Sequence, residues 1–307
     1  MSQQTAPLER GSRALSEAYA RGGIRALLQF GLAVVLLLAI YRPVLHGMVL
    51  HWYSDQDYSH GFLIAPLAAY FVWQRRKKLL RAPIEPSWWG LAPLVLGSLT
   101  FAVGRLGVEL MNLRASFVIT LIGLVVLLLG RPVFRILAFP LLFLFLMIPL
   151  PQSLVNVVAF PLQLVAADAA VNIVQMFGIP ALREGNIIHL ANASLFVAEA
   201  CSGLRSLMAL ITLGIVFAYF FRKTLVERLI IVASAIPIAV LVNAFRVALT
   251  GILTHFYGQA AAGGVIHETQ GLVTFGIAFL VLLGEAWLLA RLSLHLPWTR
   301  SAKEIRR

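Results

Sequence analysis

The sequence has few charged residues and a single cysteine. Of its 307 residues, 12% are charged and 60% are hydrophobic, and the mean hydropathy is +0.87. So little polar surface could not cover the core of a water-soluble domain, and the composition excludes one. The one cysteine, Cys201, excludes an internal disulfide framework. We also expect no cleavable signal peptide, because residues 1–23 are polar and basic and no small-residue cleavage site follows the first apolar run.

Acidic residues are scarce as well, with 13 Asp and Glu against 25 Lys and Arg and a net charge of +12. An excess of this kind can indicate nucleic-acid binding, but here the basic residues cluster in alternate gaps between apolar runs. The clusters hold 19 basic residues: Arg10, Arg13, Arg21, Arg25, Arg75, Arg76, Lys77, Lys78, Arg81, Arg131, Arg135, Arg222, Lys223, Arg228, Arg291, Arg300, Lys303, Arg306 and Arg307. Lys and Arg bias loops toward the cytoplasm, so this pattern predicts both termini inside and no nucleic-acid partner.

Long apolar runs are abundant, and runs of about 20 residues mark membrane-spanning helices. The spans are expected at 24–42, 59–74, 88–104, 115–130, 135–150, 203–221, 228–254 and 267–290. We find no internal repeat and no low-complexity linker. The sequence therefore predicts an all-α polytopic integral membrane protein with about eight transmembrane helices. Its single domain covers 24–290, between a basic cytoplasmic N-terminus (1–23) and a basic cytoplasmic tail (291–307).

Residues 151–200 do not fit this alternation, because the spans on both sides of them meet the outer face. Pro161 and Pro180 are expected to break the segment. Between them one helical stripe carries three polar residues: Asp168, Asn172 and Gln175. We predict a re-entrant or interfacial helix on the outer leaflet. The stretch NIIHLANASLFVAE (186–199) then predicts a short hairpin with Ala-Asn at the bend.

Ionisable residues gather at the positions predicted to face outside. They are His46, His51, His60, His189, His255 and His267, with Asp55, Asp57, Glu184, Glu199 and Glu268. Such groups are costly inside a membrane, so their clustering at one side suggests a site. Any one of them alone could equally belong to a solvated loop.

Cys201 stands where strand-like residues give way to an apolar helix. Free backbone N–H groups and the helix dipole at such a position stabilise a thiolate and lower the pKa of the thiol. The alternative is a buried cysteine that acts as a small apolar filler. Arg205 lies one turn further along the same helix face, and Glu199 precedes the thiol by two residues.

A second candidate, Arg246, lies inside the apolar run 229–253. It is 17 residues from the inner end of that run, about 26 Å at 1.5 Å per residue, and so near the outer interface of a slab about 30 Å thick. Asn243 shares its face. An arginine in such a run is expensive, which favours either a functional role or a structural ion pair.

The third candidate is His267, at the outer start of the last span. Cys201, Arg246 and His267 therefore reach one depth from three different helices. A cysteine and a histidine make a nucleophile and its base, and an arginine supplies a fixed cation for a developing oxyanion. Neighbours on a helix point about 100° apart, so Glu268 cannot orient His267, and Glu199 is the better candidate for that role.

The three candidates lie in three short motifs: FVAEACSGLRSL (196–207), VNAFRVALTGIL (242–253) and HETQG (267–271). These motifs resemble those of the exosortases, membrane cysteine transpeptidase-type enzymes of Gram-negative bacteria. Two further stretches share the resemblance: DYSHGFLIAPLAAYFVWQRR (57–76) and FLFLMIPLP (143–151). The resemblance implies that Cys201, Arg246 and His267 are catalytic. Arg205, Glu199 and Asn243 would support them, and the 57–76 stretch offers candidate substrate-binding residues: Asp57, Tyr58 and His60.

The resemblance also implies the partners and the location. Clients would be exported proteins whose C-terminal tail carries a short Pro-Glu-Pro-like motif, a transmembrane helix and a basic end, which holds the motif at the depth of the thiol. The enzyme would lie in the bacterial inner membrane with its active site facing the periplasm. It would pass the client to water or to an amine or lipid acceptor, among membrane lipids and without a metal or other cofactor.

Two other readings stay open. Asp55-Gln56-Asp57 resembles the acidic motif of polytopic lipid-linked glycosyltransferases, in which paired carboxylates hold a divalent metal. A metal site from His51, Asp55, Asp57 and His60 matches no strict ligand spacing. A membrane transporter would explain an intramembrane arginine and broken helices, but not a lone cysteine level with Arg246 and His267.

Overall fold

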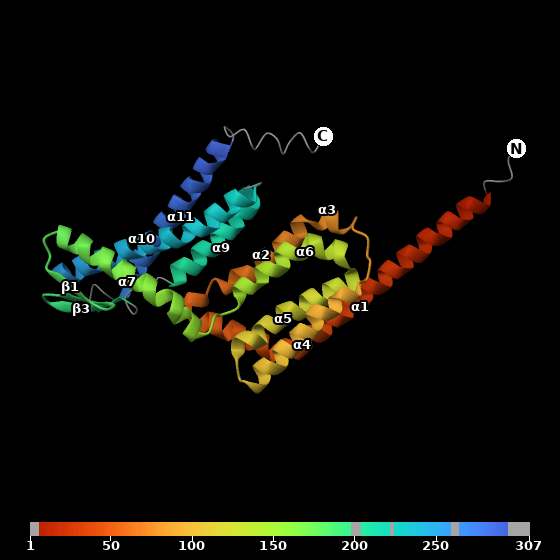
Figure 1. The fold of residues 1–307 in the computed structure, drawn as a ribbon, viewed down its shortest axis with the longest axis horizontal. Helices are drawn as coiled ribbons and strands as arrows, with labels where there is room; N and C mark the ends of the chain where they lie inside the picture. Colours follow the sequence, from red (N-terminus) through yellow and green to blue (C-terminus); the bar gives the residue numbers. More distant parts are fainter. Residues whose placement is uncertain (1–5, 198–203, 222–223, 259–263, 294–307) are drawn as a thin grey trace. The chain divides into compact units, whose positions relative to one another are not determined.

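The computed structural model describes residues 6–197, 204–221, 224–258 and 264–293 (Figure 1). Contacts between residues divide the chain into two compact units, Met1–Pro151 and Gln152–Arg307. Helices dominate both units, as the apolar runs predict. The all-α polytopic fold class is therefore confirmed, with one small sheet in the second unit.

Over its described residues, 6–151, the first unit consists of helices and their connecting loops, with one isolated β-bridge between Glu85 and Gly130. Its elements are α1 (Ala6–Ser54), η1 (Gln56–Tyr58), α2 (Gly61–Gln74), α3 (Arg76–Leu79), η2 (Trp88–Gly90), α4 (Leu91–Leu106), α5 (Leu110–Leu124), η3 (Val125–Leu129), α6 (Arg131–Phe143) and η4 (Leu144–Met147). Helices α1, α4 and α5 lie side by side (Figure 1). Small residues allow this close approach, since Gly97 of α4 faces Thr120 of α5 and Gly123 faces Leu94.

Two basic loops of the first unit lie at the same end of it. Arg75 at the end of α2 donates from Nη1 to the backbone oxygen of Ile136 in α6 at 2.7 Å. The Arg131 guanidinium at the start of α6 lies 5.8 Å from the centre of the Trp89 ring. The two clusters that the charge pattern assigns to the cytoplasm thus share one end, as that assignment requires, although the side of the membrane stays a prediction.

In its described residues, the second unit has four helices and a three-stranded sheet. Its elements are α7 (Gln152–Met176), β1 (Ala181–Glu184), β2 (Ile187–Leu190), β3 (Ala193–Phe196), α9 (Leu204–Phe221), α10 (Leu225–Tyr257) and α11 (Gly264–Ser293). The sheet is antiparallel in the order β1-β2-β3, and Ile187 pairs with Glu184 on one side and Phe196 on the other. The predicted hairpin with its Ala-Asn bend is confirmed as β2–β3, whereas β1 was not predicted.

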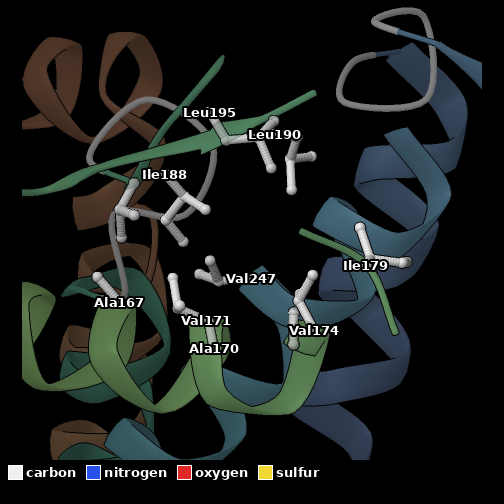
Figure 2. Close-up of a cluster of buried hydrophobic side chains, with 11 residues drawn as sticks. Ala167, Ala170, Val171, Val174, Ile179, Ile188, Leu190, Leu195 and Val247 are labelled. Atoms are coloured by element: carbon white, nitrogen blue, oxygen red, sulfur yellow. The ribbon is translucent and has the colours of Figure 1, made fainter. Parts of the chain in front are cut away.

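An apolar cluster fixes this sheet on the helices (Figure 2). Strand residues Ile188 and Leu195 point at Val171 and Val174 of α7 and at Val247 of α10. A Cβ added to Gly251, one turn beyond Val247, would lie 3.4 Å from Val174 and 3.6 Å from Leu195, so α10 packs closely on α7 and β3 at this point. Because Val247 adjoins Arg246, the cluster places β3 beside the arginine-bearing part of α10.

Helix α7 corrects the expectation for residues 151–200. Pro161 lies inside α7 without ending it, and the helix continues over 25 residues. Proline costs one backbone hydrogen bond and a local clash, and surrounding contacts can offset this cost. Two polar residues of the predicted stripe bind β1, since Asp168 accepts from Nε of Arg183 at 2.7 Å and Gln175 donates to Ala181 at 2.8 Å. The path of α7 relative to the outer leaflet stays a prediction.

The structure does not confirm the count of eight spans. In the part of the chain that is described, six helices are long and apolar enough to cross a membrane: Gly23–Ser54, Trp88–Leu106, Leu110–Leu129, Gln152–Met176, Leu225–Tyr257 and Thr269–Arg291. Arg205–Phe221 is a shorter apolar helix. The runs 59–74 and 135–150 form α2 and α6, of 14 and 13 residues. At about 21 and 20 Å these are shorter than a hydrocarbon core of about 30 Å.

Candidate functional site

The guanidinium of Arg246 lies against the backbone of α11 at Gly271. A Cβ added to Gly271 would lie 3.0 Å from Nη2 and 3.2 Å from Cζ of Arg246. The missing side chain therefore makes the space that the planar guanidinium occupies. Arg246 itself is half-buried, on the part of α10 that faces α11.

A hydrogen-bonded pair one turn beyond Arg246 joins the same two helices. Thr250 Oγ1 lies 2.9 Å from the backbone oxygen of Arg246 and 2.8 Å from Gln270 Oε1. Both Thr250 and Gln270 are buried. This buried polar pair links α10 to α11 beside the arginine.

His267 precedes Gly271 by four residues in α11. Residues four apart in a helix lie on one face, so the backbone position of His267 is on the face that receives the Arg246 guanidinium. Glu268 is the next residue in the helix. Arg246 thus meets the face of α11 to which the backbone position of His267 belongs, and the shared site and the catalytic roles of both residues stay predictions.

The predicted supporting residues differ in their surroundings. Asn243, one turn before Arg246, is buried, and its Oδ1 has no hydrogen-bond partner among the residues that the structure describes. Arg205 lies in the first turn of α9 and is exposed. The structure thus keeps Asn243 on the interior side of α10 and Arg205 at the surface of its unit.

Cys201 and Glu199 lie outside the described residues. The described residues on each side of this segment are nevertheless anchored on α10. Val197 belongs to the buried cluster that contains Val247, and Leu207 to the buried cluster that contains Ala239. The chain therefore enters and leaves the segment 198–203 beside the helix that carries Arg246.

The turn between α1 and α2 holds the weaker candidates of the first unit. The Asp55 carboxylate accepts the Asp57 N–H at 2.9 Å and so caps η1. The buried Tyr58 donates its hydroxyl to the backbone oxygen of Leu150 at 3.2 Å, which ties this turn to the stretch 143–151. The turn holds all three candidate substrate-binding residues: Asp57, Tyr58 and His60. Leu150, which accepts the hydrogen bond from Tyr58, belongs to the same unit.

Burial controls the protonation of this turn. It raises the pKa of the Tyr58 phenol above its ordinary value, and the Asp55 and Asp57 carboxylates raise it further. Burial also lowers the pKa of His60, although the backbone oxygens of Asp57 and Leu146 oppose the shift. Both side chains are therefore neutral near pH 7, which suits hydrogen bonding more than charge pairing.

Sequence reasoning missed Arg114 in α5, which is only 6% exposed. Its charge acts on Tyr58, and Glu109, the N-cap of α5, acts on the guanidinium in turn. An arginine inside the apolar run 110–129 is the same signal that singled out Arg246, so the pattern could have found it.

Metal binding has no cluster to support it in the described ranges. No group of three or more His, Cys, Asp or Glu side chains there is close enough to hold an ion. In the α1–α2 turn, His51 Nε2 lies 3.9 Å from Asp55 Oδ2.

The fold and the site together define a polytopic helical membrane protein with a candidate site where an arginine of one apolar helix meets a neighbouring one. The chain belongs to the transmembrane exosortase family, because the model of that family matches residues 52–284. The match takes in parts of both units and the positions Cys201, Arg246 and His267. No curated protein and no solved structure matches the chain.

Proposed function

We propose that this exosortase is a membrane-embedded cysteine protease and transpeptidase. It cleaves the C-terminal sorting signal of exported proteins at the outer face of the bacterial inner membrane. The signal consists of a Pro-Glu-Pro-like motif, a transmembrane helix and a basic end. Cys201 is the nucleophile, Arg246 stabilises the oxyanion, and His267 is the acid and base.

The observation that carries the proposal is the contact between Arg246 and Gly271. It supports a shared site because it joins two of the three chemical motifs across two helices. The flanks of the third motif, at Val197 and Leu207, pack on the same helix as the arginine. An arrangement in which three motifs converge is what nucleophilic catalysis with a base and an oxyanion donor needs.

The first step forms a carbon–sulfur bond and breaks the amide. The Cys201 thiolate adds to the carbonyl carbon beside the recognition motif, and the electron pair moves to the carbonyl oxygen. Collapse of this tetrahedral anion restores the carbonyl and expels the amine of the membrane-anchored fragment, which takes a proton from His267. The upstream part of the client stays attached as a thioester.

The second step releases the client. His267, now neutral, takes a proton from water or from an amine acceptor as it attacks the thioester, and the thiolate leaves. Arg246 acts in both steps, because its planar guanidinium donates to the oxyanion that exists only in the transition states and intermediates. An arginine held against a helix backbone is preorganised for this role, since its position costs no reorganisation during the reaction.

The test is the mass of the new C-terminus of a co-expressed client that carries the complete sorting tail. A client shortened to the motif indicates hydrolysis, and a client with added mass indicates transfer to an acceptor. A full-length client in the presence of inserted enzyme contradicts the proposal. The Cys201→Ala enzyme is the matched control and should leave the client uncut.

The proposed orientation has its own test. Cys201 should react with a membrane-impermeant maleimide in intact spheroplasts, because the basic clusters place it outside. Labelling that occurs only after lysis, in folded protein, would reverse the orientation and with it the outer-face location of the site.

A further inference from the structure

A cavity opens between α10 and α11 next to the Arg246–Gly271 contact. Its volume is about 320 Å³, at the lower end of small-ligand pockets. The lining is Phe245, Leu249, Leu253 and Val273 on the apolar side and Thr269, Gln270 and Thr274 on the polar side. We refer to these seven residues as the α10–α11 groove. Phe245 and Val273 are exposed, so the groove opens sideways from two membrane-spanning helices.

The polar side of the groove carries a buried amide that lacks a partner. Gln270 is 6% exposed, and its Nε2 has no hydrogen-bond partner among the described residues. Its Oε1 and the backbone oxygen of Arg246 both lie within 2.9 Å of the Thr250 hydroxyl, which has one proton to donate. Turning the amide over would let Nε2 donate to Thr250 and would leave Oε1 alone instead. In either orientation one polar atom of Gln270 has no partner among the residues that the structure describes.

The unpartnered atom of Gln270 can be used to compare a lipid with a peptide as the occupant of the groove. A lipid acyl chain has no hydrogen-bonding group, and a lipid ester only accepts. A peptide backbone offers an N–H donor and a carbonyl acceptor at every residue except proline, so it satisfies Gln270 in both orientations of the amide. Leaving a buried amide group unpaired is unfavourable, because the group has lost its hydrogen bonds to water. The chemistry of the groove therefore favours a peptide in non-helical conformation.

The size and place of the groove fit a short peptide. From Phe245 to Leu253 α10 rises about 12 Å, which is the length of about three to four extended residues. Phe245 adjoins Arg246 in α10, and Gln270 adjoins Gly271 in α11. A peptide in the groove thus lies along residues that are next in sequence to Arg246 and Gly271.

We propose that the α10–α11 groove binds the client polypeptide next to the bond that is cut, where the chain leaves its membrane anchor. Apolar client side chains contact Leu249, Leu253 and Val273, and the client backbone bonds to Gln270. A client held in the bilayer by its own helix enters sideways through the open side of the groove. This inference rests on the proposed peptidase function and adds to it the surface that selects the substrate.

Cross-linking tests the contact directly, because the enzyme has one cysteine. Val273→Cys in the Cys201→Ala background makes a single thiol in the groove, and the probe is a client tail with one cysteine just before its transmembrane helix. Leu272→Cys is the matched control, since Leu272 neighbours Val273, is exposed, and does not line the groove. A short bis-maleimide should join client to enzyme at position 273 and not at 272. Equal yields at both positions, or none at 273, would overturn the groove as the client site.

Kinetics give a second and independent readout. Leu249→Trp fills the groove and should raise the KM for the client about tenfold, the effect of losing about 1.4 kcal/mol of binding, while the maleimide reactivity of Cys201 stays unchanged. Leu272→Trp should leave KM unchanged. An unchanged KM in Leu249→Trp contradicts the inference. A phospholipid with a photoreactive acyl chain gives a further test. If it labels position 273 strongly, and added client does not reduce this labelling, the inference is also contradicted.

The two proposals can fail separately. Cleavage by the wild-type enzyme without a cross-link at position 273 removes the groove and leaves the peptidase function in place. A cross-link at 273 together with normal cleavage by Cys201→Ala keeps the groove as a client-binding surface and removes the cysteine mechanism.

Discussion

Arg114 and Arg246 both interrupt an apolar helix, one in each unit, yet their surroundings differ. Arg114 is almost fully buried and interacts electrostatically with Glu109, the N-cap residue of the same helix. Arg246 is half-buried and lies on the bare backbone of Gly271, beside a groove. A buried cation with a compensating carboxylate in its own unit is suited to stabilising the fold. Removing the cation leaves the carboxylate of Glu109 without an opposite charge. A cation held flat beside a groove is suited to bind a substrate.

The largest expected effect tests whether the chemistry belongs to the second unit. Cys201→Ala should abolish client cleavage while the protein stays inserted and still binds the client. Cys201→Ser should be nearly as inactive, because a helix terminus does not ionise an alcohol appreciably near neutral pH. The measurement is the yield of shortened client by mass. Normal cleavage by Cys201→Ala would contradict the assignment of the chemistry to the second unit, because the proposed nucleophile of that unit would then not be needed.

The next effect concerns Arg246. Arg246→Ala should lower the rate of cleavage by about 10²–10³, the typical loss of an oxyanion donor. Arg246→Lys should recover little, because a point charge does not reproduce a planar fork. Initial rates are normalised to inserted enzyme, with the thiol reactivity of Cys201 against pH as a control. Arg205→Lys should keep much more activity, and a reversal of these two lysine variants would exchange the roles of the arginines.

Arg114 provides the counterpart in the first unit. Arg114→Met should reduce the amount of folded, inserted protein by leaving the charge of Glu109 without its counterpart, while the rate per folded molecule stays within a few-fold of wild type. Unfolding in detergent and cleavage rate are measured on the same preparation. A fall in rate like that of Arg246→Ala, with unchanged stability, would place Arg114 in the reaction and remove the contrast.

Gly271→Ala sharpens the account of how Arg246 is placed. The new Cβ would meet the guanidinium at 3.0–3.2 Å, so the flexible end of the arginine must shift. A misplacement of about 1 Å can cost up to about 10² in rate, and we expect a loss of at least about tenfold with little change in unfolding temperature. Gly276→Ala is the matched control on α11, since nothing lies within 4 Å of its added Cβ. Equal rates for the two variants would show that the contact at Gly271 does not position the arginine.

The smallest effect is a pH dependence confined to the first unit. Burial lowers the pKa of His60 below its ordinary 6.5, so the folded state binds this proton less readily than the unfolded chain. The stability contributed by neutral His60 is therefore complete above about pH 6.5 and is lost as the pH falls through the lowered pKa. His60→Gln should flatten the fall in unfolding temperature between about pH 7 and pH 5. His46→Gln, at an exposed site on α1, should keep the wild-type slope, and an unchanged slope in His60→Gln would contradict the prediction.

Several features follow from local patterns and could be predicted from the sequence. The helical runs, the β2–β3 hairpin with its Ala-Asn bend, and the grouping of two basic loops at one end depend on short-range periodicity and on charge. Arg246 and His267 were singled out because charge bias and helix rise give depth in a membrane. The same reasoning could have found Arg114.

Other features depend on contacts between distant segments. Whether Pro161 ends α7 depends on the contacts that surround the helix. Strand β1 forms through its hydrogen bonds to β2 and through the bond from Gln175 of α7 to Ala181. The apolar run 59–74 ends at the same residue as α2, but the run 135–150 gives no sign that α6 begins at Arg131 and ends at Phe143. Hydropathy reports how apolar a run is, and helix ends also depend on tertiary packing.

The sequence by itself determined that the chain lies in a membrane. It also predicted which residues of its motifs carry chemistry and at which depth they occur. Those properties are set by side-chain transfer energies and by the fixed rise of a helix. Only the tertiary structure decided which helix faces meet. It set the Arg246 guanidinium on Gly271, joined Thr250 to Gln270, and left a groove beside them. These contacts join segments of two helices, and no local pattern encodes which side of α10 turns toward α11.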